Sequence, residues 1–116
     1  MSKNKNDRYY AEKLLVYIQK ALSISKHIDF SSPSSNEVGL FAVNFCLIEM
    51  REIAGKLTSS FLQSHPEIDL PSLIAFRNVL AHDYGQVDFS AYRSLIAQDL
   101  PKMEKELFKY VHFLSE

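Results

Sequence analysis

An arginine, a histidine and a tyrosine follow one another at short spacing in residues 76–85, whose sequence is FRNVLAHDYG. Arg77 carries a permanent cation whose planar fork matches a phosphate group. His82 can give or take a proton near neutral pH, and Tyr84 adds a phenol that can bind a ligand or be modified. The spacing Arg-x-x-x-x-His-x-Tyr therefore suggests phosphate chemistry without a metal ion.

Cleavage of RNA is the reaction that suits these groups. The ribose 2′-hydroxyl would attack the adjacent phosphorus and leave a cyclic phosphate. His82 would transfer the proton, a role typically worth ~10²–10⁴ in rate. Arg77 would hold the phosphate and stabilise the charge of the transition state, while Tyr84 would position the phosphate or a base. Asn78 and Asp83 are polar neighbours that could orient the substrate or His82.

A structural role for the same residues is the alternative. Arg77 can pair with Asp83 or Glu67, and His82 can cap the carbonyls at the end of a helix. No two of the four histidines have the spacing of a ligand pair, and the chain has a single cysteine. We therefore expect no metal site and no cofactor, and we expect Cys46 to be a buried, reduced thiol.

Helices must position these residues, because apolar side chains recur with a helical period almost throughout the chain. We expect a first helix over residues 7–29 and a loop over residues 30–36. Asn36 is the predicted N-cap of a second helix that runs to Ser64. The sequence HPEIDLP of residues 65–71 then breaks this helix.

The motif is expected to lie on a short third helix that is capped by Asp69 and ends at Gly85. Arg77 and Tyr84 are seven residues apart, so they return to nearly the same face of that helix. All three motif side chains can then line one cleft.

The last part of the chain predicts a further helix with a break in it. Asp88 can cap the helix, which restarts or kinks at residues 99–101. Pro101 suits the first turn of the final segment. Together these elements predict one all-α domain over residues 1–116, an up-and-down bundle of four to five helices.

The front half of the second helix, residues 39–50, is apolar nearly all round, with only Asn44 and Glu49 interrupting. A helix that is apolar on more than one side needs more than one partner surface. In so short a chain the second partner is expected to be another copy. We therefore predict a homodimer with this helix at or near its interface.

The charge balance narrows the possible partners. The formal charge is -1, with 13 basic and 14 acidic side chains, so RNA would have to bind a local patch. No apolar run approaches the ~20 residues of a membrane span, and the polar N-terminal residues do not form a signal peptide. We expect a cytoplasmic protein without a membrane partner.

The sequence resembles the HEPN domain family, and specifically the HepT-type toxins of bacterial and archaeal toxin–antitoxin pairs. The resemblance covers about residues 38–110. It rests on the Arg-x-x-x-x-His-x-Tyr motif and on flanking matches: the approach HPEIDLP, the Arg77–Asn78 pair, Val87–Asp88 and residues 99–101.

The resemblance implies a helical homodimer whose two motif copies meet at a shared cleft, and a metal-independent endoribonuclease that stops growth when unrestrained. Arg77 and His82 would be its catalytic pair. It also implies a cognate minimal nucleotidyltransferase antitoxin that adds AMP to Tyr84. The bulky anionic group would block the cleft and occupy Arg77, which would silence the nuclease.

Two positions depart from the family pattern. Residues 50–52 read MRE where the family often has Ile-Gly-Glu, so Arg51 takes the place of a closely packed glycine. It either shifts the spacing of the helices or faces the cleft and binds RNA. Leu70 replaces a tryptophan and still offers an apolar side chain.

Two other functions remain open from the sequence. One is a non-catalytic helical module that binds substrate and presents it to a nucleotidyltransferase. The other is a dimeric structural protein without a site. The intact pair of Arg77 and His82 favours the nuclease, because an idle scaffold needs neither.

Overall fold

The computed structural model describes residues 6–32, 36–69, 71, 73 and 89–113, except for the side chains of Phe89 and Ala91. The elements in chain order are α1 (Asp7–Ser25), α2 (Glu37–Ala54), α3 (Ser59–Ser64), α5 (Phe89–Ser94), the π-helical turn η4 (Leu95–Asp99) and α6 (Leu100–Phe113). All regular structure among the described residues is helical, so the predicted all-α bundle is confirmed. No helix in these ranges is long and apolar enough to cross a bilayer.

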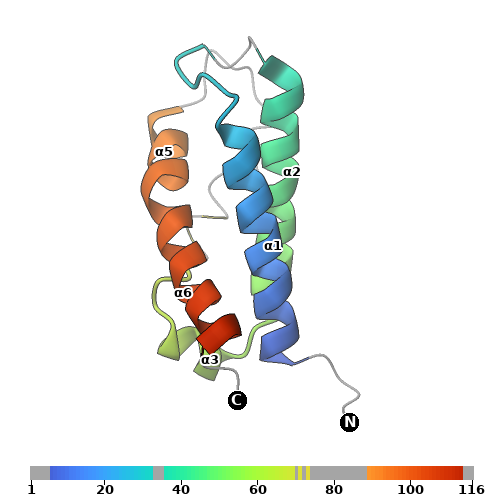
Figure 1. The fold of residues 1–116 in the computed structure, drawn as a ribbon, viewed down its shortest axis with the longest axis vertical. Coiled ribbons are helices and arrows are strands. Elements are labelled where there is room, and N and C mark those ends of the chain that lie inside the picture. The colour runs from blue at the N-terminus through green and yellow to red at the C-terminus, as the bar shows by residue number, and fades with distance from the viewer. Residues whose placement is uncertain (1–5, 33–35, 70, 72, 74–88, 114–116) are drawn as a thin grey trace.

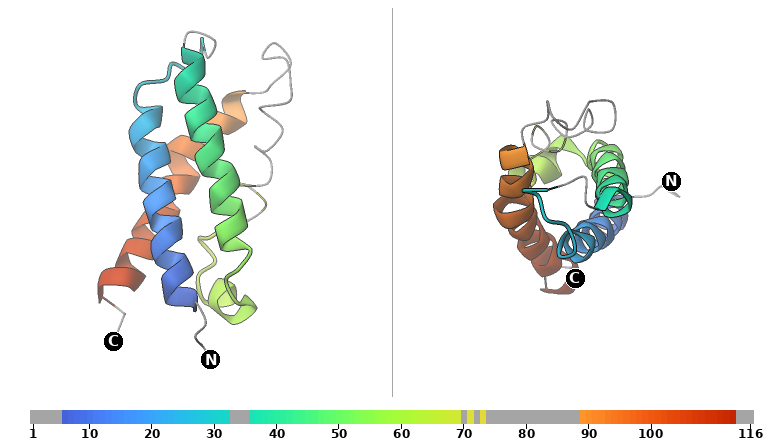
Figure 2. Two further views of the ribbon diagram at one scale, coloured as in Figure 1. Left: turned by 90° about the vertical axis from the view of Figure 1, so that its right-hand side faces the viewer. Right: turned by 90° about the horizontal axis from the view of Figure 1, so that it is seen from above.

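The long helices lie side by side and alternate in direction (Figures 1 and 2). α1 packs against α2 on one side and α6 on the other. α2 and the α5–η4–α6 run both descend in Figure 1, opposite to α1. The first turn of α1 is fixed to the end of α6, because the Arg8 guanidinium donates to the Val111 carbonyl at 3.0 Å.

α1 ends at Ser25, four residues before the predicted end at Asp29. The chain leaves the helix through tighter turns, in which the amide of Ile28 donates to the carbonyl of Ser25. The carboxylate of Asp29 then accepts hydrogen bonds from the amide and hydroxyl of Ser31, at 2.9 and 2.6 Å. An aspartate that bonds to the backbone two residues on favours a turn over a helix.

The predicted cap of α2 is confirmed. The Asn36 side chain accepts from the amide of Gly39 at 3.0 Å and donates to the carbonyl of His27 at 3.1 Å. A Cβ atom on residue 39 would lie 2.8 Å from the Asn36 amide nitrogen, so glycine permits this close cap. The cap thereby joins the turn that follows α1 to the start of α2.

The prediction that the second helix runs to Ser64 is wrong, because α2 ends at Ala54 and α3 begins anew. Thr58 caps α3 by accepting from the amide of Phe61 at 3.1 Å. Its own amide and hydroxyl donate to the carboxylate of Asp7 at 2.9 and 2.7 Å. The start of α1 therefore holds Thr58 in a conformation that a continuous helix would not allow.

The predicted restart at residues 99–101 is confirmed, and it takes the form of a π-helical turn. In η4 the amide of Leu100 donates to the carbonyl of Leu95, five residues earlier. Pro101 follows as the second residue of α6. A widened turn of this kind accommodates a proline that has no amide hydrogen to donate.

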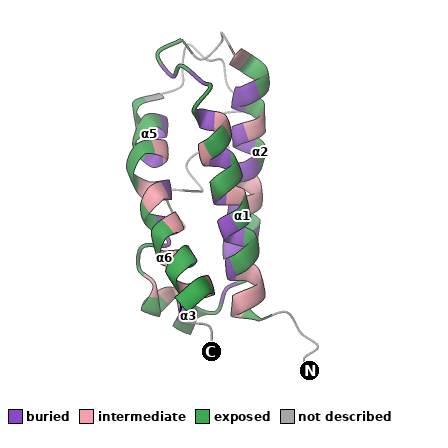
Figure 3. Ribbon diagram, viewed as in Figure 1, coloured by how far each residue is buried: buried purple, intermediate pink, exposed green. Residues whose placement is uncertain are grey.

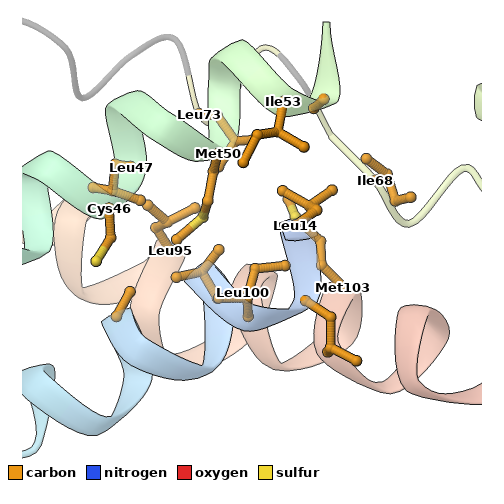
Figure 4. Close-up of a cluster of buried hydrophobic side chains, with 14 of the residues drawn as sticks. Leu14, Cys46, Leu47, Met50, Ile53, Ile68, Leu73, Leu95, Leu100 and Met103 are labelled. Atoms are coloured by element: carbon orange, nitrogen blue, oxygen red, sulfur yellow. The ribbon is translucent and has the colours of Figure 1, made fainter. Parts of the chain in front are cut away.

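The core lies between α1, α2 and the α5–α6 run, as the buried faces in Figure 3 show. Its largest fully buried aliphatic side chains are Leu14, Ile18, Leu40, Leu47, Met50, Leu73, Leu95, Leu100, Met103 and Leu107. Figure 4 shows several of them meeting from different helices. Cys46 is buried and free, as expected, and its burial raises the pKa of the thiol.

Candidate functional site

The predicted motif residues lie outside the described residues: Arg77, Asn78, His82, Asp83 and Tyr84. Their catalytic, binding and modification roles stay predictions. The described part of the chain reaches to within four residues of Arg77 at Leu73, which is helical and fully buried. Leu73 lies beside Met50 and Ile53 of α2 in Figure 4. The approach to the motif is therefore packed on the last turns of α2.

Arg51 is the predicted site residue that the structure describes, and it follows Met50 in that part of α2. Its side chain is partly buried, and its buried Nε atom finds no hydrogen-bond partner within the part of the chain that the structure describes. A buried donor that lacks a partner costs about 1–3 kcal/mol. Because this Nε atom is shielded from solvent, any contact of Arg51 with a ligand would have to come from the other nitrogens of its guanidinium group.

A second buried donor lies on the same face of α2. Asn44 is seven residues before Arg51, so the two side chains share one helical stripe. Asn44 is fully buried, and its Oδ1 atom accepts from the Tyr92 hydroxyl at 3.0 Å. Its Nδ2 atom has no hydrogen-bond partner among the described residues. Asn44 and Arg51 thus place two N–H donors, each without a described hydrogen-bond partner, in the interior of a mostly apolar bundle.

Tyr92 connects this stripe to α5. It is fully buried, as expected for a core residue, and its ring lies 5.0 Å from that of Phe30. Sequence reasoning missed its hydrogen bond to Asn44. The available signal was the isolated amide in the apolar stretch of residues 39–50, because a buried amide requires a partner.

A histidine–carboxylate pair joins α3 to α6 at the other end of the bundle. His65 Nδ1 lies 2.5 Å from Glu106 Oε2, and both side chains are mostly buried. The Phe61 ring stacks on His65 with centroids 4.2 Å apart. The sequence indicated only that His65 lies near a helix end. Across the described ranges, no group of three His, Cys, Asp or Glu residues is arranged to hold a metal ion.

The described helices form an all-α bundle of the HEPN type. The chain belongs to the HepT-like ribonuclease family, whose family model, described as "Ribonuclease HepT-like", matches residues 14–109. That range includes Arg51 and every residue of the Arg-x-x-x-x-His-x-Tyr motif.

Three curated relatives come from Methanocaldococcus jannaschii. The chain is 25% identical over 103 residues to the protein named "Putative RNase MJ0125", a match that covers 89% of each chain. It is 24% identical to "Putative RNase MJ1380", over 74% of this chain and 79% of the relative. It is also 24% identical to "Putative RNase MJ1216", over 84% of this chain and 81% of the relative. No solved structure matches the chain significantly.

Proposed function

We propose that this protein is a metal-independent endoribonuclease and the toxin of a toxin–antitoxin pair. The observation that carries the proposal is the family match, which spans the whole motif from Arg77 to Tyr84. The names of the three relatives, each given as an RNase, support the same activity.

The proposed reaction needs one proton acceptor, one proton donor and a cation. His82 of one protomer takes the proton of the ribose 2′-hydroxyl as its oxygen attacks the adjacent phosphorus. The bond from phosphorus to the 5′-oxygen breaks, and the second copy of His82 in a shared cleft protonates that oxygen. The products are a cyclic phosphate and a 5′-hydroxyl. Arg77 stabilises the extra negative charge on the phosphorane oxygens.

A shared cleft requires a dimer, and one face of α2 supports it. Val38, Phe41 and Phe45 lie at positions that return to the same side of the helix, and they are 81%, 46% and 54% exposed. Apolar groups exposed together on a helix are typical of a surface that another protein covers. We name these three residues the α2 apolar face and assign it to the homodimer interface.

Arg51 is proposed to bind the RNA backbone next to the motif. Its permanent cation on a partly exposed side chain and its position next to Met50, beside which Leu73 lies (Figure 4), support this role. A glycine at this position would offer no charge. An arginine can add a phosphate contact that positions the RNA backbone.

Regulation is proposed to act on Tyr84. The phenolic oxygen attacks the α-phosphorus of ATP in a cognate nucleotidyltransferase, AMP is transferred to the tyrosine, and pyrophosphate leaves. The added phosphate would pair with Arg77 and fill the cleft. Incubation with that enzyme and ATP should add one or more AMP masses, and Tyr84→Phe should prevent the addition. A gain of mass that persists in Tyr84→Phe would refute the site.

Expression in a bacterial host tests the toxin role. Wild-type protein should arrest growth, while His82→Ala should accumulate to the same level without arrest. The alternative is a non-catalytic module that presents substrate to a nucleotidyltransferase, and the near-neutral charge of -1 favours it. Equal growth of the two cultures would support that alternative against the toxin.

A further inference from the structure

One face of α1 carries lysine and tyrosine side chains in alternation. Tyr9, Lys13, Tyr17 and Lys20 follow at spacings of four, four and three residues, so they share one side of the helix. The two tyrosines are half-buried and the two lysines are exposed. We name these four residues the α1 stripe. They lie on α1 and are separate in the sequence from the motif of residues 77–84.

Each lysine of the α1 stripe lies over a tyrosine ring. Lys13 Nζ is 5.5 Å from the centre of the Tyr9 ring, and Lys20 Nζ is 5.6 Å from that of Tyr17. Neither lysine has a carboxylate within ion-pair distance among the described residues. The two ammonium groups are thus held next to aromatic rings with their charges uncompensated.

The surface beside this stripe is hollowed. Lys13, Val16, Tyr17 and Lys20 line a shallow pocket of about 280 Å³, and no acidic side chain is among them. A second hollow of about 220 Å³ begins at Lys13 and runs between α1 and α2. Glu49 and Glu52 of α2 line that second hollow, together with Lys56 just after α2 and with Tyr9, Tyr10 and Lys13 of α1. Of the two hollows, the one between Lys13 and Lys20 is therefore the one with basic and without acidic lining residues.

We propose that the α1 stripe binds the backbone and bases of single-stranded RNA outside the catalytic cleft. Proteins that bind single strands without sequence preference combine aromatic rings, on which bases stack, with cations that contact phosphates. The α1 stripe supplies both groups in alternation. This inference rests on the proposed ribonuclease function and extends its RNA contacts beyond the motif.

The α1 stripe lies next to the proposed dimer interface. The ring of Tyr17 contacts that of Phe45, with centroids 6.4 Å apart, so the stripe borders the α2 apolar face. In a dimer formed through that face, the stripes of both protomers would flank the interface.

Binding of a fluorescent single-stranded RNA to the full-length His82→Ala protein tests the inference without cleavage. The stripe variant adds Lys13→Gln and Lys20→Gln. The matched control adds Lys105→Gln and Lys109→Gln, which remove the same charge from exposed positions of α6. Each lost phosphate contact should reduce the slope of log affinity against log salt by about 0.7. The stripe variant should lose about twice that slope, and the control should keep it.

Tyr17→Leu provides a second variant that keeps an apolar side chain but removes the ring. It should weaken RNA binding about tenfold, as expected for the loss of one stacked base. Equal binding by the stripe variant and its control would overturn the proposal. A change in oligomeric mass without a change in RNA binding by the stripe variant would also overturn the proposal, because the α1 stripe would then be a protein interface. Cleavage by the wild type is scored separately, so failure of the nuclease and failure of the stripe are distinguishable.

Discussion

The hydroxyl of Tyr92 on α5 donates to the side-chain oxygen of Asn44 on α2 at 3.0 Å, and neither residue is exposed to solvent. The bond links residues that are 48 positions apart in the sequence, on two different helices. Because α5 follows the motif segment and α2 carries Arg51, this bond fixes part of the frame on which the site depends.

Removal of that hydroxyl should destabilise the fold. Tyr92→Phe leaves the Asn44 amide without its donor, and the free energy of unfolding should fall by about 1–3 kcal/mol. The control is the double variant Tyr92→Phe with Asn44→Leu, which removes both polar groups and should recover most of the loss. Urea unfolding measures all three proteins. A Tyr92→Phe protein as stable as the wild type would show that the bond contributes nothing.

Disruption of the α2 apolar face should separate the proposed dimer. Phe45→Glu places a charge where we expect a second copy to pack, and the protein should run as a monomer in light scattering coupled to gel filtration. Phe108→Glu is the matched control, because Phe108 is a partly exposed aromatic residue on α6, and it should leave the mass unchanged. A wild type that is already monomeric, or a Phe45→Glu protein that stays dimeric, contradicts this interface.

Asp29 should make stability depend on acid pH. The hydroxyl and amide of Ser31 and, more weakly, the charge of Arg93 hold the pKa of Asp29 below its usual value of 3.8. A lowered folded pKa stabilises the protein above the unfolded pKa, and this contribution is lost as the pH falls through the folded value. Asp29→Asn should therefore be less stable than the wild type at neutral pH. The difference should shrink as the pH falls below 3.8 and vanish once the pH has fallen through the lower folded pKa of Asp29.

Two measurements test the predicted pH dependence of the Asp29 contribution to stability. Urea midpoints for wild type and Asp29→Asn across the acid range give the difference directly. Ser31→Ala removes the first cause of the shift, so the wild-type advantage should shrink in that background. A difference between Asp and Asn that stays constant with pH would refute the assigned cause.

Local signals predicted several helix ends correctly. Asn36 caps α2 as expected, and Pro101 follows the predicted interruption. Both depend on chemistry within a few residues of the end that they mark. The predicted end of α2 was wrong because the actual end depends on a contact that is distant in the sequence. Thr58 donates hydrogen bonds to Asp7, which is 51 residues away.

The regular spacing of apolar residues continues across the break between α2 and α3, so the sequence did not indicate that break. Ile53, Leu57 and Phe61 recur every four residues, and all three are buried. They belong to α2, to the turn after it and to α3, so the core is filled while the backbone changes direction. The Tyr92–Asn44 hydrogen bond could not be predicted from the sequence either, because its two partners come together only when the bundle forms.

The central claim is that His82 and Arg77 cleave RNA without a metal ion. The most direct measurement is cleavage of a defined single-stranded RNA by purified wild-type protein in excess chelator, with His82→Ala purified in parallel. The wild type should produce fragments that end in cyclic phosphate, and His82→Ala should lose at least ~10²-fold in rate with unchanged helical content and mass. Cleavage by the wild type no faster than by His82→Ala, on each of several RNAs, would contradict the claim.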